Sequence, residues 1–138
     1  MAGMNGHALQ NVEEQIAAAS AYTSLGRGKE AELILTNLTS ALEAQLSSPD
    51  RVNPKLWYVK AQVMALRGES NLALQHLQRA IDQGWRQHWR PFVEPCMEGL
   101  LELQTFQSMM AGLAARMQLM GEQLEFDSLF ASVAQQSA

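Results

Sequence analysis

The sequence contains little of what disulfide-rich or nucleic-acid-binding proteins require. Of its 138 residues only Cys96 is a cysteine, so an internal disulfide and a thiolate metal site are excluded. Fourteen acidic residues outnumber ten basic ones, giving a net charge of −4. Binding to DNA or RNA needs a dense basic face that displaces counterions. We therefore do not expect this domain to bind nucleic acid.

Long hydrophobic runs are also missing. Every stretch of about 18 residues, the length that spans a bilayer, contains charged or strongly polar side chains. The N-terminus lacks the basic flank and apolar run of a signal peptide. We expect no membrane insertion by this segment, and the compartment stays open between cytoplasm and periplasm.

What the chain does contain favours helices. It is 47% hydrophobic with only four prolines, and it is rich in Ala, Leu and Gln. Its length suits one domain. We expect a tag or flexible N-terminus over residues 1–7, a single all-α domain over 8–133, and a frayed tail over 134–138.

Two helical hairpins are predicted from apolar spacing of three and four residues. The first pairs helices over 8–25 and 29–46 around a Gly26-Arg27-Gly28 turn. The second begins at Asn53-Pro54, an N-cap followed by proline at the first helical position, and pairs helices over 54–67 and 70–83. Gly68 should end the third helix, Ser70 or Asn71 should cap the fourth, and Gly84 should end it in a left-handed conformation.

The pattern loosens after Gly84. We expect a short helical turn over 85–90, a helix over 95–103 after two prolines, and a long helix over 105–133. Glycines at 112 and 121 predict that the long helix is kinked or split.

The second hairpin resembles one family closely. Tryptophan and small or apolar residues stand at the positions of the tetratricopeptide repeat (TPR) motif, namely Trp57, Ala61, Met64, Ala73, Leu77 and Ala80. Lys60 and Trp85 depart from that motif, where leucine and proline are usual. The first hairpin is a more degenerate match: placing Gly26 over Gly68 aligns Ala19 with Ala61 and Ala31 with Ala73. The resemblance implies repeats over 12–46 and 54–85, stacked as a short solenoid, with capping helices over 86–133.

A second resemblance concerns the run after Gly84. The tryptophan-containing turn over 85–90, the Pro95-Cys96-Met97 sequence and the later Phe106-Gln107 are similar to the ends of TPR arrays in membrane-anchored bacterial winged-helix transcriptional regulators and multidomain signalling proteins. This implies that the chain is the sensory or scaffolding part of a larger protein.

Binding residues follow from the TPR resemblance. The positions equivalent to the concave face are Lys55, Tyr58 and Gln62, which implies a protein or peptide partner. Trp89 and Arg90 form a second candidate surface: if helical, Trp85 and Trp89 would lie on one side with Arg90 beside them. The alternative is that these tryptophans close the open end of the hairpin.

Catalytic and metal-binding patterns are not found. His76, His88 and Cys96 lack the spacing of a zinc motif, and the sequence contains no phosphate-binding loop or nucleophile elbow. We therefore predict no enzyme activity and no cofactor.

The C-terminal methionines offer an alternative to partner binding. Five methionines, with Leu113 and Leu124, form a flexible apolar stripe: Met97, Met109, Met110, Met117 and Met120. Such a stripe either fills an irregular core or supports self-association. The alternative function is therefore a structural segment that makes a homodimer through this helix and binds no free ligand.

Overall fold

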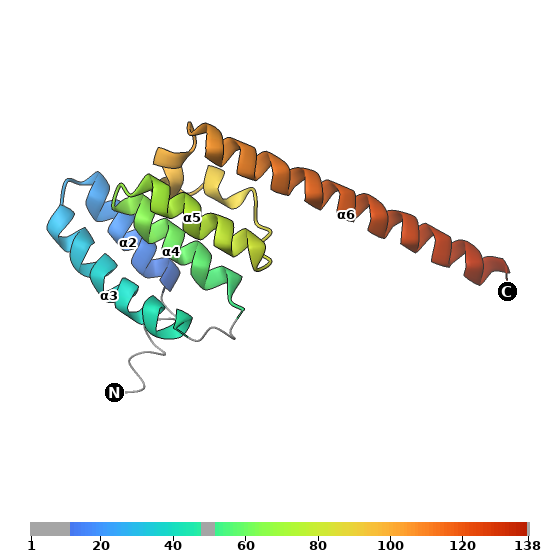
Figure 1. Ribbon diagram of the computed structural model, residues 1–138, viewed down its shortest axis with the longest axis horizontal. Helices are drawn as coiled ribbons and strands as arrows, with labels where there is room; N and C mark the ends of the chain where they lie inside the picture. The colour runs from blue at the N-terminus through green and yellow to red at the C-terminus, as the bar shows by residue number, and fades with distance from the viewer. Residues whose placement is uncertain (1–11, 48–51, 138) are drawn as a thin grey trace.

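The computed structural model describes residues 12–47 and 52–137, with side chains as far as Gly121. The described chain is all-α, as predicted. Its helices are α2 (Val12–Ser24), α3 (Gly28–Leu46), α4 (Pro54–Leu66), α5 (Ser70–Asp82) and α6 (Gln104–Ser137), with 3-10 helices η1 (Arg90–Phe92) and η2 (Pro95–Leu100) between α5 and α6 (Figure 1). The predicted tag or flexible segment over 1–7 lies outside the described residues.

Helices α2 and α3 form one antiparallel pair and α4 and α5 form another (Figure 1). The helices before the turns end in the same way, because Gly26 and Gly68 both have positive φ, at 76° and 77°. After each glycine the chain donates back across the last helical turn, Arg27 N to Tyr22 O at 2.8 Å and Glu69 N to Met64 O at 2.9 Å. This is the Schellman arrangement, in which glycine avoids the strain that a Cβ would meet at positive φ. The predicted turns are confirmed.

The start of α4 is also as predicted. The Asn53 side chain accepts a hydrogen bond from Leu56 N at 3.3 Å, and Pro54 occupies the first helical position. The predicted cap of α5 is wrong, because the helix begins at Ser70 itself with Glu69 as N-cap. Gly84 has a φ of 114° and ends α5 as expected.

Helix α4 packs against both α2 and α3 and joins the pairs into one layered body. Small residues are fully buried in α2, α4 and α5, where Ala19, Ala61 and Ala73 are all 0% exposed. An alanine at a helix contact lets the two axes approach more closely than a larger side chain would. Leu35, Leu38, Leu42 and Leu77 fill the space around them.

Trp57, which stands at the tryptophan position of the repeat motif, is not fully buried in the core. Its ring is half-buried beside the core. The Lys60 ammonium lies 5.1 Å from the ring centroid and the Arg79 guanidinium 4.9 Å from it, while the His76 ring is 5.6 Å away. The ring therefore supports the long basic side chains of two helices.

The segment after α5 differs from the prediction. Residues 85–89 are not helical; η1 covers only three residues and η2 ends at Leu100. Prolines at 91 and 95 explain this, since each removes a backbone donor and clashes with the preceding turn of an α-helix. The segment crosses α4 and α2, and its Pro91, Met97 and Leu100 are buried in the core.

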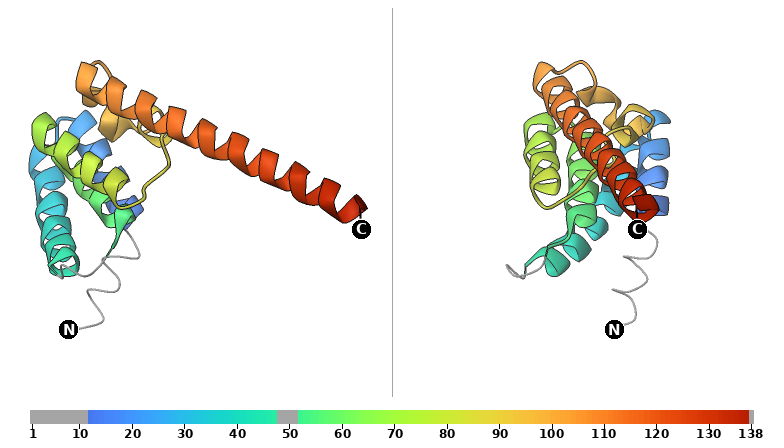
Figure 2. Two further views of the ribbon diagram at one scale, coloured as in Figure 1. Left: turned by 45° about the vertical axis from the view of Figure 1, so that its right-hand side comes forward. Right: turned by 90° about the vertical axis from the view of Figure 1, so that its right-hand side faces the viewer.

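Helix α6 is continuous from Gln104 to Ser137 and straight in outline (Figure 1), so the predicted kink or split at Gly112 or Gly121 is wrong. The helix includes residues 134–137, where a frayed tail was expected. Its first turns pack on the body through Phe106, Met110 and Leu113, which are at most 3% exposed. The rest projects away from the body (Figures 1 and 2). Leu119 and Met120 are 65% and 54% exposed.

Candidate functional site

A glutamate is inserted into the face of α4 that the sequence predicted to be open. Glu94 Oε1 accepts a hydrogen bond from the Tyr58 hydroxyl at 2.5 Å, and Glu94 Oε2 accepts one from Gln62 Nε2 at 2.6 Å. Arg90 Nε lies 2.7 Å from Oε1. Tyr58 and Gln62 stand one turn apart on α4, so both reach the same carboxylate. The carboxylate thereby joins α4 to the segment between α5 and α6.

Electrostatics keep the Tyr58 hydroxyl protonated and Arg90 charged. Burial, followed by the hydrogen bond to Glu94, raises the pKa of the Tyr58 phenol above its ordinary value of 10.0. The hydroxyl therefore remains a donor. Burial alone would lower the pKa of Arg90, but the carboxylates of Glu94 and Glu13 outweigh it and the pKa is raised.

Arg90 connects this cluster to α2. Its second terminal nitrogen lies 2.9 Å from Glu13 Oε1, and its guanidinium lies over the Tyr58 ring at 4.9 Å from the centroid. The Trp85 ring stacks against Tyr58, with centroids 4.7 Å apart and planes inclined by 12°. A guanidinium and an indole thus both pack on the tyrosine ring, and three parts of the chain are held together.

The predicted binding face is therefore not open in this structure. Tyr58 is 0% and Gln62 1% exposed, because residues 90–97 cover them. Lys55 is exposed at the start of α4, apart from this cluster. Sequence periodicity correctly placed Tyr58 and Gln62 on one side of α4, but it could not show that the chain itself covers that side.

The second predicted surface, formed by Trp89 and Arg90 beside Trp85, is also only partly exposed. Trp85 is 4% and Trp89 57% exposed, so the two indoles do not form one aromatic face. Arg90 is mostly buried, with its side chain 15% exposed, and it serves the internal ion pairs. Of the predicted binding residues Trp89 and Arg90, only Trp89 lies at the surface.

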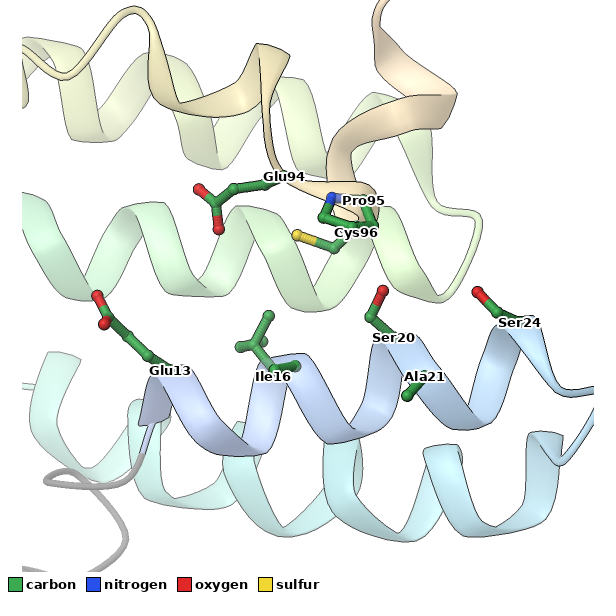
Figure 3. A pocket seen from close by; sticks show the side chains of 9 residues that line it. Glu13, Ile16, Ser20, Ala21, Ser24, Glu94, Pro95 and Cys96 are labelled. Carbon is green, nitrogen blue, oxygen red and sulfur yellow. The ribbon is translucent and has the colours of Figure 1, made fainter.

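An open groove remains next to the Glu94 cluster, between α2 and the start of η2 (Figure 3). We call it the α2 groove; its volume is about 290 Å³, and it is lined by Glu13, Ile16, Ala17, Ser20, Ala21, Ser24, Glu94, Pro95 and Cys96. Figure 3 shows Ile16, Ser20 and Ser24 rising from α2 toward Pro95 and Cys96. The walls are mainly apolar or small. The carboxyl groups of Glu13 and Glu94 stand at the same end of the groove.

Cys96 lines the groove but is suited to packing rather than nucleophilic chemistry. The residue is 6% exposed, and burial, with the nearby Glu94 carboxylate, raises the pKa of its thiol to about 11. A reactive cysteine needs a lowered pKa, because the thiolate is the nucleophile. The Gln62 amide lies 3.6 Å from the sulfur.

Among the described residues, neither a metal site nor a membrane-spanning helix is found. Among them, no three His, Cys, Asp or Glu side chains cluster closely enough to hold a metal ion. No helix within the same ranges has the length and apolar character needed to cross a membrane.

The residues that sequence analysis missed are Glu13, Glu94 and Pro95. Glu13 looks like an ordinary acidic residue in the first turn of a helix. A signal did exist for Glu94: it is a single acid between two prolines, in a segment that cannot continue as an α-helix. Comparison of the chain with protein-family models, with curated proteins and with solved structures finds no significant match.

Proposed function

We propose that this chain is a non-catalytic protein-interaction module of TPR type that holds a segment of a partner protein in the α2 groove. The groove carries the proposal, because it is an open apolar depression on a well-packed helical layer. Ligand sites are typically concave and mostly apolar with a few placed polar groups. Glu13 and the serines at 20 and 24 supply such groups here.

Support for the TPR type comes from the pattern of burial. Ala19 and Ala61, which align when Gly26 is placed over Gly68, are both fully buried, and so are Leu35 and Leu77 at 2% and 0% exposure. That the module belongs to a larger regulator, as the second resemblance implies, stays a prediction.

The location of the groove changes the experiment that tests binding. Substituting Tyr58 and Gln62 would remove buried hydrogen bonds and would test stability instead. Ala21 is exposed and lines the groove, so Ala21→Leu fills the groove without disturbing the core. Ala44→Leu on α3 makes the same change at an exposed site outside the groove.

Affinity capture from the lysate of the source cell compares these two variants with the parent. We expect a partner that the parent and Ala44→Leu retain and that Ala21→Leu loses. Recovery of the same proteins by all three would contradict docking in the α2 groove.

A second candidate function is self-association through α6. The observation in its favour is that Leu119 and Met120 are exposed on the part of the helix that projects from the body (Figure 2). Monomeric proteins seldom leave extended apolar patches uncovered. Light scattering over a range of protein concentrations distinguishes the candidates, because a stable dimer would favour this second one.

A further inference from the structure

The α2 groove has an acidic end. Glu13 and Glu94 place two carboxylates there, and one guanidinium, Arg90, contacts both. Glu94 accepts from Tyr58, Gln62 and Arg90 and is thereby satisfied. The Glu13 side chain is 62% exposed, and Arg90 contacts only its Oε1 atom among the contacts of the described residues. Glu13 can therefore accept a further cationic group from solvent.

The dimensions of the groove favour an extended occupant. Its lining on α2 runs from Glu13 to Ser24, eleven steps along the helix, which is about 16 Å at ~1.5 Å per residue. An extended chain covers that length with about five residues at ~3.3 Å each. A helix of the same length and ~10 Å diameter occupies on the order of 1,200 Å³. The groove holds about 290 Å³, which is room for side chains from one edge of an extended segment and not for a whole helix.

The walls specify those side chains. In an extended segment alternate residues face the same way, so two or three of about five would point into the groove. Ile16, Ala21 and Pro95 present apolar surface to them. The hydroxyls of Ser20 and Ser24 rise from α2 on the same side (Figure 3) and can donate to backbone carbonyls of the segment.

From these observations we infer that the occupant of the α2 groove is an extended partner segment of about five residues, with small or medium apolar side chains and a lysine or arginine at the Glu13 end. This inference rests on the proposed function and specifies its partner class. An acidic segment would meet like charge at that end, where two carboxylates face one guanidinium.

Synthetic peptides test the charge preference. The probes are capped pentapeptides in which lysine, glutamine or glutamate is followed by Val-Ala-Val-Ala. The same peptides in reversed order are included, because the segment can lie in the groove in either chain direction. Binding is followed by methyl NMR signals of Ile16, Ala17 and Ala21. A unit charge ~4 Å from another in water changes affinity about fivefold, so lysine should bind about fivefold more tightly than glutamine, and glutamate more weakly still.

Variants locate the effect. Glu13→Gln should abolish the preference for lysine over glutamine, whereas Glu14→Gln, the adjacent exposed carboxylate that does not line the groove, should preserve most of it. Ala21→Leu should weaken all peptides at least tenfold, since it fills the space that they enter. Higher salt should reduce the lysine preference alone.

The outcomes separate the two proposals. Groove binding with no dependence on peptide charge would overturn the basic-segment inference and leave the docking function in place. A peptide set that shifts no groove methyl signal would overturn both.

Discussion

Replacing Glu94 by alanine removes the one acceptor shared by Tyr58, Gln62 and Arg90. We expect Glu94→Ala to be folded but markedly less stable. The reason is that α4 loses its polar link to residues 90–97, while two donors in the interior lose their acceptor. A buried donor without a partner costs its desolvation free energy in full.

The size of the effect follows from the geometry. Tyr58 and Gln62 are 0% and 1% exposed, so water reaches neither easily. Each loses a hydrogen bond to a charged group worth about 1.5–3 kcal/mol, about 3–6 kcal/mol for both. Removing the carboxylate also removes the desolvation cost of burying it. The Glu94 side chain is 20% exposed, so water can replace part of the lost hydrogen bonding. We therefore expect a net loss of about 2–4 kcal/mol, a large part of the ~5–15 kcal/mol typical of a domain.

Urea unfolding followed by tryptophan fluorescence measures this loss, because Trp85 stacks directly on Tyr58. Glu98→Ala is the matched control: it removes an exposed glutamate four residues away and should change the free energy of unfolding by less than about 0.5 kcal/mol. A double-mutant cycle of Glu94→Ala with Tyr58→Phe should give a coupling free energy of about 1 kcal/mol. If Glu94→Ala proved as stable as Glu98→Ala, the cluster would not hold the segment in place.

Three further predictions concern the body of the fold. Trp57→Ala should lower the free energy of unfolding by about 1–3 kcal/mol, less than the ~3–5 kcal/mol of a fully buried aromatic residue, because the ring is half-buried; a loss in the higher range would contradict its partial exposure. Ala73→Leu should lower the free energy of unfolding by about 1–3 kcal/mol, because it overpacks a fully buried helix contact. If Ala73→Leu were as stable as the variant Ala44→Leu at an exposed site, the buried contact at Ala73 would be contradicted. Burial raises the pKa of Cys96 from 9.0 to about 11, so between these pH values the native chain holds a proton that the unfolded chain releases. The contribution of this thiol to stability is therefore constant below about pH 9. It is lost as the pH rises toward 11, by up to about 1.4 kcal/mol per pH unit. Denaturation measured across this pH range should show a smaller fall in the free energy of unfolding for Cys96→Ala than for the parent.

Most of the fold up to Gly84 could be predicted because local rules determine it. Asn53 and Pro54 begin a helix, glycines at 26 and 68 end helices, and apolar periodicity identifies the buried sides. These signals act within a few residues of the chain. The tertiary packing is consistent with these local signals, and the two antiparallel helix pairs form as expected.

The site could not be predicted in the same way, because its contacts are distant in sequence. Glu94 meets Tyr58 and Gln62 across 36 and 32 residues, and Arg90 meets Glu13 across 77. Helical periodicity can place Tyr58 and Gln62 on one side of α4, but it says nothing about what covers them. Prolines at 91 and 95 indicate a break in helix and do not specify its path.

The last prediction concerns α6 and separates the two candidate functions. A chain ending at Gln118 keeps Phe106, Met110 and Leu113, which are buried, and lacks Leu119 and Met120, the exposed residues that favour self-association. We expect its stability to match that of the full chain within about 0.5 kcal/mol, since Leu119 and Met120 are mostly exposed and the rest of the removed helix projects away from the body (Figures 1 and 2). A chain ending at Leu103 loses those contacts and should be destabilised by several kcal/mol, at about 2–5 for each large apolar side chain.

Light scattering and peptide titration of the chain ending at Gln118 then give opposite results for the two functions. If the chain is a docking module, the shortened protein and the parent are both monomers and bind the lysine peptide with the same affinity, because the α2 groove lies on α2 and η2. If α6 makes a dimer, the parent is a dimer and its shortened form is a monomer at the same concentration. A fall in peptide affinity without a change in oligomeric state would contradict both accounts, since it would require the projecting part of α6 to contribute to the groove.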